Sequence, residues 1–267
     1  MSFPNATSIA ATAFENCIAL TDVSLPKATS IDKTAFDGCT GLTSVSFPEA
    51  NIIGENAFEG FTSLISVNIP KATSIGKEAF KDCTGLSSVS FPVVTEIGES
   101  AFAGDKGLTS ISFPVAIKIG EGAFTECKGL TSVSFPEADN IGVSAFEDCS
   151  SIQSVDFPKT RTIGASAFAG CDSLLGGISF PVVRTIGSEA FANTKVTILS
   201  LPAVQRIGDD VFLGKLTNIT INYYVAFGDA DPDDGNFAAF IDFYEDGDSE
   251  AGTYWYDQVR NKWNKQQ

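Results

Sequence analysis

The chain has 267 residues, a formal net charge of −16 and no histidine. The acidity argues against binding of nucleic acid or anionic lipid, because both need clustered Lys and Arg. Without histidine, a Ser-His-Asp or Cys-His site is excluded within this chain, and the commonest zinc ligand is missing. We therefore expect a protein that is not an enzyme and has no cofactor and no metal site.

A Phe-Pro dipeptide, or a close variant, recurs along most of the chain. The step between successive prolines is 22 residues seven times, then 23, then 21, at Pro4, Pro26, Pro48, Pro70, Pro92, Pro114, Pro136, Pro158, Pro181 and Pro202. A fixed period of this length is typical of a solenoid, in which each repeat is one coil. The period predicts a solenoid of about ten 22-residue coils over residues 1–222.

The chain opens within a repeat, with no visible signal peptide and no N-terminal cap. No apolar run approaches the roughly 18 residues that span a bilayer, so we expect no direct membrane insertion. A natural solenoid usually has a cap over its first coil. We therefore expect a fragment of a longer protein, which can form a homodimer through its uncapped N-terminal coil.

The first half of each repeat predicts a strand. In the copy at residues 42–63, Val45 and Phe47 alternate with serines, which is the period of a half-buried strand. Pro48 cannot donate a hydrogen bond to a sheet, so it ends the strand. Equivalent strands of successive coils should pair in parallel, about 4.8 Å apart.

The second half of each repeat predicts a compact turn. Ile53 points inward, and Gly54 allows a tight or left-handed turn. The residues up to Phe58 predict a short helical or 3₁₀ turn that inserts the ring into the core. Burial of one such ring contributes about 2–3 kcal/mol. A ladder of rings in the core is therefore expected, with an aromatic ligand platform as the alternative.

Six cysteines share one repeat position, three residues after the core phenylalanine, at Cys17, Cys39, Cys83, Cys127, Cys149 and Cys171. Phe61 and Asp105 take the same place in other coils, so the position mainly fills space. Disulfides between neighbouring coils, such as Cys149–Cys171, are an open alternative. Cys83 has no cysteine in either neighbouring coil, so we predict reduced, structural thiols.

These residues resemble the BspA-like leucine-rich repeat family, whose pattern is LxxLxLPxxLxxIGxxAFxxC. The match covers residues 3–222, and residues 75–83, IGKEAFKDC, keep the second half of the pattern. The resemblance implies an α/β repeat solenoid, a right-handed leucine-rich-repeat horseshoe. Its parallel β-sheet would be concave and its short helical or 3₁₀ turns convex. It also implies a bacterial cell-surface or secreted protein that mediates adhesion or protein binding.

Residues 223–267 lack the repeat and are predicted to form a small β cap over the last coil. Residues 240–244 alternate like a strand, and residues 252–256 and 262–264 are typical of a β-hairpin. The alternative is an aromatic ligand patch, built by Tyr254, Trp255, Tyr256 and Trp263.

Two acidic runs stand in this C-terminal segment. Residues 229–235 resemble the start of an EF-hand calcium loop, but Asp234 stands where the glycine belongs and Phe240 where the bidentate Glu belongs. A solvated acidic loop is the better interpretation. Residues 245–250 indicate a hairpin turn.

The outward residues of the predicted strands form the candidate ligand surface. They are small, polar and almost all uncharged: Thr43, Ser44, Ser46, Ser66, Asn68, Ser88, Ser90, Ser110, Ser112, Ser132, Ser134, Ser154 and Asp156. Such a surface suits shallow, multivalent contact with a protein, of the host or the extracellular matrix, or with a glycan. The alternative is that these side chains only solvate the sheet. The protein would then be a structural spacer or a self-assembling scaffold.

Overall fold

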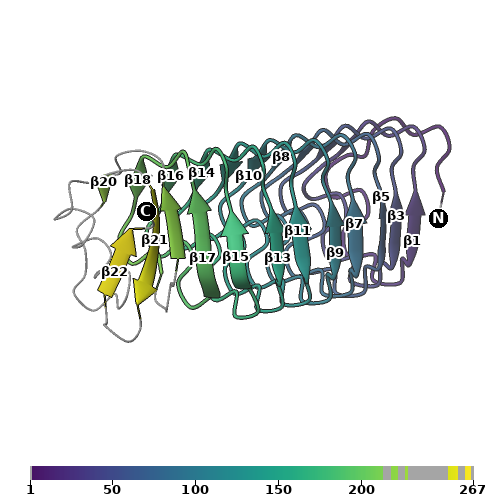
Figure 1. Ribbon diagram of the computed structural model, residues 1–267. Coiled ribbons are helices and arrows are strands. Elements are labelled where there is room, and N and C mark those ends of the chain that lie inside the picture. Colours follow the sequence, from purple (N-terminus) through teal and green to yellow (C-terminus); the bar gives the residue numbers. More distant parts are fainter. Residues whose placement is uncertain (1, 213–217, 222–225, 228–251, 258–261, 266–267) are drawn as a thin grey trace.

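The computed structural model describes residues 2–212, 218–221, 226–227, 252–257 and 262–265 (Figure 1). They form an elongated rod of stacked coils, with the first and last described residues at opposite ends. Most coils contribute two short strands, and the strands that pair between neighbouring coils of the solenoid are parallel. The second strands of the coils form one continuous sheet, whereas the first strands are divided among four shorter sheets. The predicted leucine-rich-repeat solenoid with parallel strands is therefore confirmed.

The front strands occupy the Ser-Val-Ser part of each repeat. In β3, the side chain of Val45 is buried and those of Ser44 and Ser46 face outward, as the alternation predicts. The front strands are β1 (Asp22–Ser24), β3 (Ser44–Ser46), β5 (Ser66–Asn68), β7 (Ser88–Ser90), β9 (Ser110–Ser112), β11 (Ser132–Ser134), β13 (Ser154–Asp156), β15 (Leu175–Ser179), β17 (Lys195–Leu201) and β19 (Asn218–Ile221).

The back strands form a second sheet that the sequence did not predict. Two residues are too few to show an alternation, yet these strands join into one continuous ten-stranded parallel sheet. Each ends on a buried residue of the Ile53 type, where its side chain is described. The back strands are β2 (Ser30–Ile31), β4 (Ile52–Ile53), β6 (Ser74–Ile75), β8 (Glu96–Ile97), β10 (Lys118–Ile119), β12 (Asn140–Ile141), β14 (Thr162–Ile163), β16 (Thr185–Ile186), β18 (Arg206–Ile207) and β20 (Ala226–Phe227).

Tight turns replace the predicted short helical or 3₁₀ turns, and the described residues contain no helix. Two residues of a typical coil are left-handed, for example Asn56 with φ of 54° and Gly60 with φ of 74°. Such residues interrupt any right-handed helical run. The N–H of Phe58 instead donates to the carbonyl oxygen of Ala79 in the next coil, at 2.8 Å. The backbone groups of the turn are thus satisfied between coils.

The glycine after the buried isoleucine has a different role from the predicted one. Gly54 and its equivalent Gly98 do not have a positive φ, so of the two predicted alternatives, a tight turn or a left-handed turn, the left-handed one is wrong. A Cβ atom on Gly98 would lie 2.6 Å from the carbonyl carbon of Gly76 in the preceding coil. Glycine is required here because the coils approach each other too closely for a side chain.

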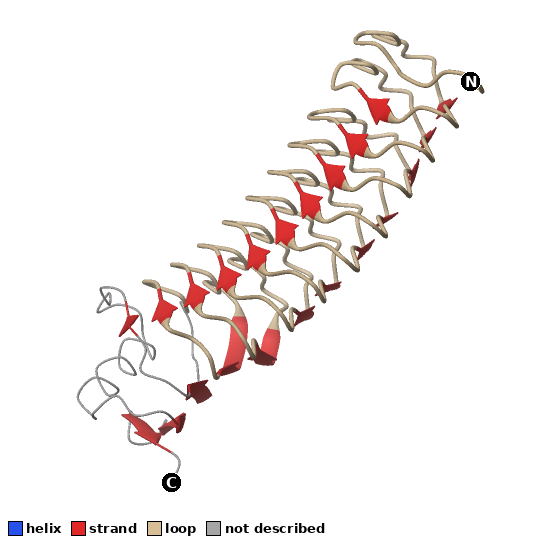
Figure 2. Ribbon diagram, turned by 90° about the horizontal axis from the view of Figure 1, so that it is seen from above, coloured by secondary structure: helices blue, strands red, loops and turns tan. Residues whose placement is uncertain are grey.

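The rod is nearly straight (Figure 2). A leucine-rich repeat curves when helices, about 10–12 Å wide, cover one side and strands about 4.8 Å apart cover the other. Here both the front and the back of each coil are extended strands, so the two faces advance by the same step. The front face is consequently flat along the rod instead of concave.

Phenylalanine rings form the predicted ladder in the core. The ring of Phe124 is fully buried and stacks on Phe102 and Phe146, with centroids 5.2 and 5.3 Å away. The phenylalanines that precede proline form a second row, and Phe113 and Phe135 contact Phe124 at 5.9 and 6.0 Å. Because these rings are buried, they stabilise the coils and cannot serve as a ligand platform.

The six cysteines are free thiols, and all except Cys17 are buried. The Sγ–H of Cys83 donates to the carbonyl oxygen of Phe58 in the preceding coil, at 3.0 Å. Burial raises the pKa of the Cys83 thiol, so it stays protonated and can donate. Four other cysteines make the same bond at the same spacing. The predicted structural role of free thiols is confirmed for the five buried cysteines, and Cys17 is a free but exposed thiol.

Asp105 replaces a cysteine in this buried column. Its side chain is fully buried, and neither carboxyl oxygen has a hydrogen-bond partner among the described residues. Burial raises the pKa of the Asp105 carboxyl from its ordinary value of 3.8 to about 9, and the backbone of Cys83 offsets only part of this rise. Asp105 is therefore protonated and neutral near pH 7.

The C-terminal strands pair antiparallel. β21 (Gly252–Asp257) pairs with β19, and β22 (Lys262–Lys265) pairs with β21, which confirms the predicted hairpin. Tyr254, Trp255, Tyr256 and Trp263 lie in this hairpin, of which the structure describes the backbone pairing. The predicted strand at 240–244 and the acidic runs at 229–235 and 245–250 lie outside the described residues. The division into a solenoid at 1–222 and a cap at 223–267 stays a prediction.

We predict that Phe124→Ala lowers the free energy of unfolding by about 3–5 kcal/mol, because it removes a ring that packs on four others. Phe14→Ala, in the half-buried ring of the first described coil, should cost less. Urea denaturation monitored by circular dichroism measures both. Equal losses in the free energy of unfolding would show that the buried ring of Phe124 contributes no more stability than the half-buried ring of Phe14.

We predict that Asp105→Cys stabilises the protein, and that the gain grows with pH. The carboxyl ionises near 3.8 when unfolded but stays protonated up to about 9 when folded. The free energy of unfolding of the unsubstituted protein therefore falls as pH rises through this window, by up to about 1.4 kcal/mol per pH unit. Cysteine at position 105 removes this pH-dependent loss of stability, and its thiol can donate a hydrogen bond to the carbonyl oxygen of Phe80.

Urea denaturation of both proteins at pH 5, 6, 7 and 8, under reducing conditions, measures the difference. Asp172→Cys, at an exposed position, is the matched control and should leave the gap to the unsubstituted protein constant. Parallel pH profiles for Asp105→Cys and the unsubstituted protein would show that Asp105 is not protonated in the folded state.

Candidate functional site

The thirteen predicted ligand-surface residues lie along one face of the rod. Twelve occupy the first and third places of the front strands β3 to β13, and Thr43 directly precedes β3. Parallel pairing places Ser44 opposite Ser66 and Ser46 opposite Asn68, and the same register holds within the pairs β7–β9 and β11–β13. The structure thus brings these residues together as one polar surface, which we call the serine face.

Some side chains of the serine face bond to each other between coils. The Nδ2 of Asn68 donates to the Oγ of Ser46 at 3.0 Å, and the Oγ of Ser134 donates to Asp156 at 2.9 Å. At the N-terminal end, Ser44 donates to Asp22, and this hydrogen bond is the main cause that lowers the pKa of the Asp22 carboxyl. A hydrogen-bonded carboxylate therefore lies at each end: Asp156 within the serine face, and Asp22 in the strand β1 beside it.

The middle of the serine face has hydroxyls without protein partners. Ser88, Ser90, Ser110 and Ser112 are exposed, and their side chains make no hydrogen bond within the described part of the chain. A hydroxyl can both donate and accept, so this region offers both kinds of bond to a ligand. It offers no charged anchor.

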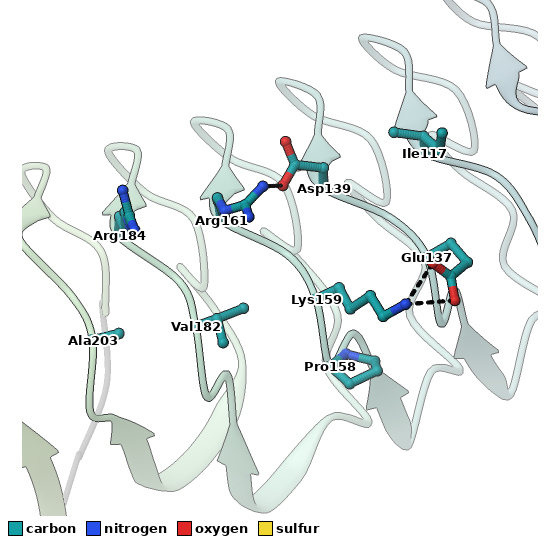
Figure 3. Close-up of a pocket in the computed structure, with 9 residues that line it drawn as sticks. All are labelled: Ile117, Glu137, Asp139, Pro158, Lys159, Arg161, Val182, Arg184 and Ala203. Carbon is teal, nitrogen blue, oxygen red and sulfur yellow. Dashed lines mark hydrogen bonds and ion pairs between the residues drawn. The ribbon is translucent and has the colours of Figure 1, made fainter.

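A groove lies on a flank of the rod, in the segment that links each front strand to the following back strand (Figure 3). Its volume is about 570 Å³. We call it the flank groove; its lining is Ile117, Glu137, Asp139, Pro158, Lys159, Arg161, Val182, Arg184 and Ala203. None of the thirteen predicted residues lines it.

Ion pairs between neighbouring coils stand in the flank groove. The Nζ of Lys159 lies 2.6 Å from the Oε2 of Glu137, and the Nη1 of Arg161 lies 2.7 Å from the Oδ1 of Asp139. Arg184 follows Arg161 in the next coil and makes no ion pair with any described residue. These side chains are at least partly exposed, so water and salt weaken the pairs.

A second groove, of about 550 Å³, lies at the N-terminal end of the described solenoid. Its lining is almost entirely apolar and includes Phe3, Phe14, Cys17, Ile18 and Leu20. The side chain of Ile18 is 69% exposed. We call this surface the end groove.

Within the described residues, no group of three or more His, Cys, Asp or Glu could hold a metal ion. The same part of the chain has no helix long and apolar enough to cross a membrane. Neither finding adds a candidate site to the three surfaces.

The model of the BspA type leucine rich repeat region matches residues 7–118 and 95–220, with six copies. The chain belongs to this family. BspA-type repeat proteins often take part in protein–protein interaction at surfaces, and their fold is typically non-catalytic. A comparison with curated proteins gives no match.

Solved structures confirm the fold of this BspA-type chain. A leucine-rich repeat protein from Bacteroides ovatus is 21% identical, over 85% of this chain and 82% of its own, with a TM-score of 0.60. A leucine rich cell surface protein from Faecalibacterium prausnitzii is 20% identical, over 79% of this chain and 82% of its own, with a TM-score of 0.53. A leucine rich repeat protein from T. pallidum is 26% identical, over 65% of this chain and 81% of its own, with a TM-score of 0.54.

Sequence reasoning missed the flank groove because its residues stand where the BspA-type repeat varies. The residue after the proline is Glu137, Lys159, Val182 and Ala203 in four successive coils, which shows no constant chemistry. One signal was present. Arg161, Arg184 and Arg206 follow each other at 23 and 22 residues, which places all arginines of the predicted solenoid in consecutive coils.

Proposed function

We propose that this protein is a non-enzymatic cell-surface or secreted protein that mediates adhesion or protein–protein binding through its serine face. The partners would be host or extracellular-matrix proteins, or glycans. The family supports the binding role. The cell surface protein from Faecalibacterium prausnitzii, which has a similar fold, supports the location.

The unpartnered hydroxyls in the middle of the serine face are the observation that carries this proposal. Ser88 and Ser110 stand opposite each other in adjacent strands, as do Ser90 and Ser112. A partner that lies across the strands can therefore make the same hydrogen bond once per coil, about every 4.8 Å. Each bond contributes only about 1 kcal/mol, so binding depends on many coils at once.

We predict that three lysines on the serine face, Ser44→Lys, Ser88→Lys and Ser132→Lys together, weaken partner binding about tenfold or more. A long charged side chain at every second coil separates the partner from the hydroxyls and must lose hydration on contact. Biolayer interferometry with immobilised extracellular-matrix proteins and a glycan panel measures the affinities.

Thr40→Lys, Thr62→Lys and Thr84→Lys together are the matched control, because these exposed threonines lie on the turn side and the added charge is the same. The control should bind like the unsubstituted protein. If every partner that binds is unaffected by the serine-face substitutions, the serine face is not the binding surface.

A second candidate function is a structural spacer that self-assembles. The apolar lining of the end groove favours this function. The side chains of Phe3 and Ile18 are exposed, and a second copy that covers them would lower the free energy of the assembly. Two copies joined at their end grooves would form a homodimer in which the serine face of each copy stays exposed.

We predict that the chain sediments as a dimer at micromolar concentration and that Ile18→Lys makes it monomeric, because the ammonium would be buried in an apolar contact. Ile65→Lys, at a side chain that is 62% exposed away from the end groove, should leave the dimer intact. Sedimentation velocity measures the state. A monomer at all concentrations, or dissociation by Ile65→Lys as well, would rule out assembly through this surface.

A further inference from the structure

The flank groove has a local excess of positive charge in a protein whose net charge is −16. Its charged lining consists of three cations and two carboxylates, and both carboxylates are already paired, with Lys159 and Arg161. One cation, Arg184, is left over. Among the charged residues that line the groove, Arg184 is therefore the one without an ion-pair partner in the described part of the chain.

The position of Arg184 explains why it has no partner. Three ion pairs on this flank join equivalent residues of neighbouring coils: Lys71 with Glu49, Lys159 with Glu137, and Arg161 with Asp139. Arg184 has Arg161, a like charge, on one side and the uncharged Gln205 on the other. The intercoil pairing thus ends with a guanidinium that can donate hydrogen bonds to a carboxylate of a ligand.

Apolar side chains lie in the groove beside the cations. Val182 is 39% exposed and Ile117 is 51% exposed, and Pro158 and Ala203 complete the apolar lining. Figure 3 shows two rows, with Ile117, Asp139, Arg161 and Arg184 in one and Glu137, Lys159, Val182 and Ala203 in the other. A ligand at the end of the groove toward Ala203 therefore meets Arg161 and Arg184 along one edge and the aliphatic groups of Val182 and Ala203 along the other.

We infer that the flank groove binds an acidic peptide segment of a partner protein, in an extended conformation, with acidic and apolar residues in alternation. Side chains of an extended chain point to opposite sides at successive residues. A segment that runs along the rod can direct its carboxylates to Arg161 and Arg184 and its apolar side chains to Val182 and Ala203. This site is separate from the serine face and does not depend on it.

The chemistry of the groove favours a peptide over other acidic polymers. An acidic polysaccharide supplies carboxylates but no aliphatic side chain to cover Val182 and Pro158, so that apolar surface would stay in contact with water. A nucleic acid needs many phosphate contacts, and one unpaired arginine supplies few. The guanidinium forms two parallel hydrogen bonds with a carboxylate, which suits glutamate or aspartate side chains.

The experiment uses the full chain and a fluorescein-labelled hexapeptide, Val-Glu-Val-Glu-Val-Glu, in fluorescence anisotropy at 150 mM salt, where long-range repulsion by the protein's charge is screened. We expect this peptide to bind and Val-Gln-Val-Gln-Val-Gln not to bind. Arg184→Gln should weaken binding about tenfold, because one charge-assisted bidentate contact is lost. Arg184→Lys should weaken it less, because the charge remains.

Lys71→Gln is the matched control, since Lys71 is an exposed cation on the same flank that pairs with Glu49 at 2.6 Å, away from the groove. It should leave binding unchanged. The inference is overturned if the glutamine peptide binds as tightly as the glutamate peptide, or if Arg184→Gln and Lys71→Gln have equal effects. It is also overturned if polygalacturonate binds in an Arg184-dependent way and the glutamate peptide does not.

Discussion

The close approach of successive coils is the constraint on which the rest of this structure depends. A Cβ atom at Gly98 would collide with the backbone of Gly76, so the step between coils is only as large as the distance between two backbones. The core uses the same step, because Phe102, Phe124 and Phe146 stack at 5.2 and 5.3 Å. At this spacing the backbone N–H groups of each turn reach carbonyl oxygens of the next coil, which removes the need for helices.

The equal step on both sides makes the rod straight and its front face flat. Residues that set the step are the glycine, the buried isoleucine and the phenylalanines, and they are nearly constant from coil to coil. The side chains of the isoleucines and phenylalanines are buried, so they contribute stability and cannot contact a partner. Any binding must use the positions that point outward. The serine face and the flank groove are two such sets of positions in the described rod.

The two surfaces differ in how they can select a partner. The serine face repeats the same neutral hydroxyl in consecutive coils, so its binding strength depends on the length of contact more than on any one residue. The flank groove is local and charged, and its exposed ion pairs contribute about 0–1 kcal/mol each to stability. Arg161 can therefore exchange Asp139 for a carboxylate of a ligand with only a small loss of stability. In the interior, by contrast, burial keeps the Asp105 carboxyl protonated and neutral instead of leaving it as a charged, paired group.

The amino-acid sequence by itself determined the period, the front strands, the phenylalanine ladder, the free thiols and the C-terminal hairpin. These features follow from residue type and spacing alone, as with Val45 between two serines. Only the tertiary structure decided that the turns contain no helix, because their N–H groups bond to the next coil and left-handed residues such as Asn56 interrupt the run. It also decided the back sheet, the role of Gly98 and the flank groove. Each of these arises from contacts between residues about one coil apart, and the charge left on Arg184 becomes visible only when the neighbouring coils are stacked.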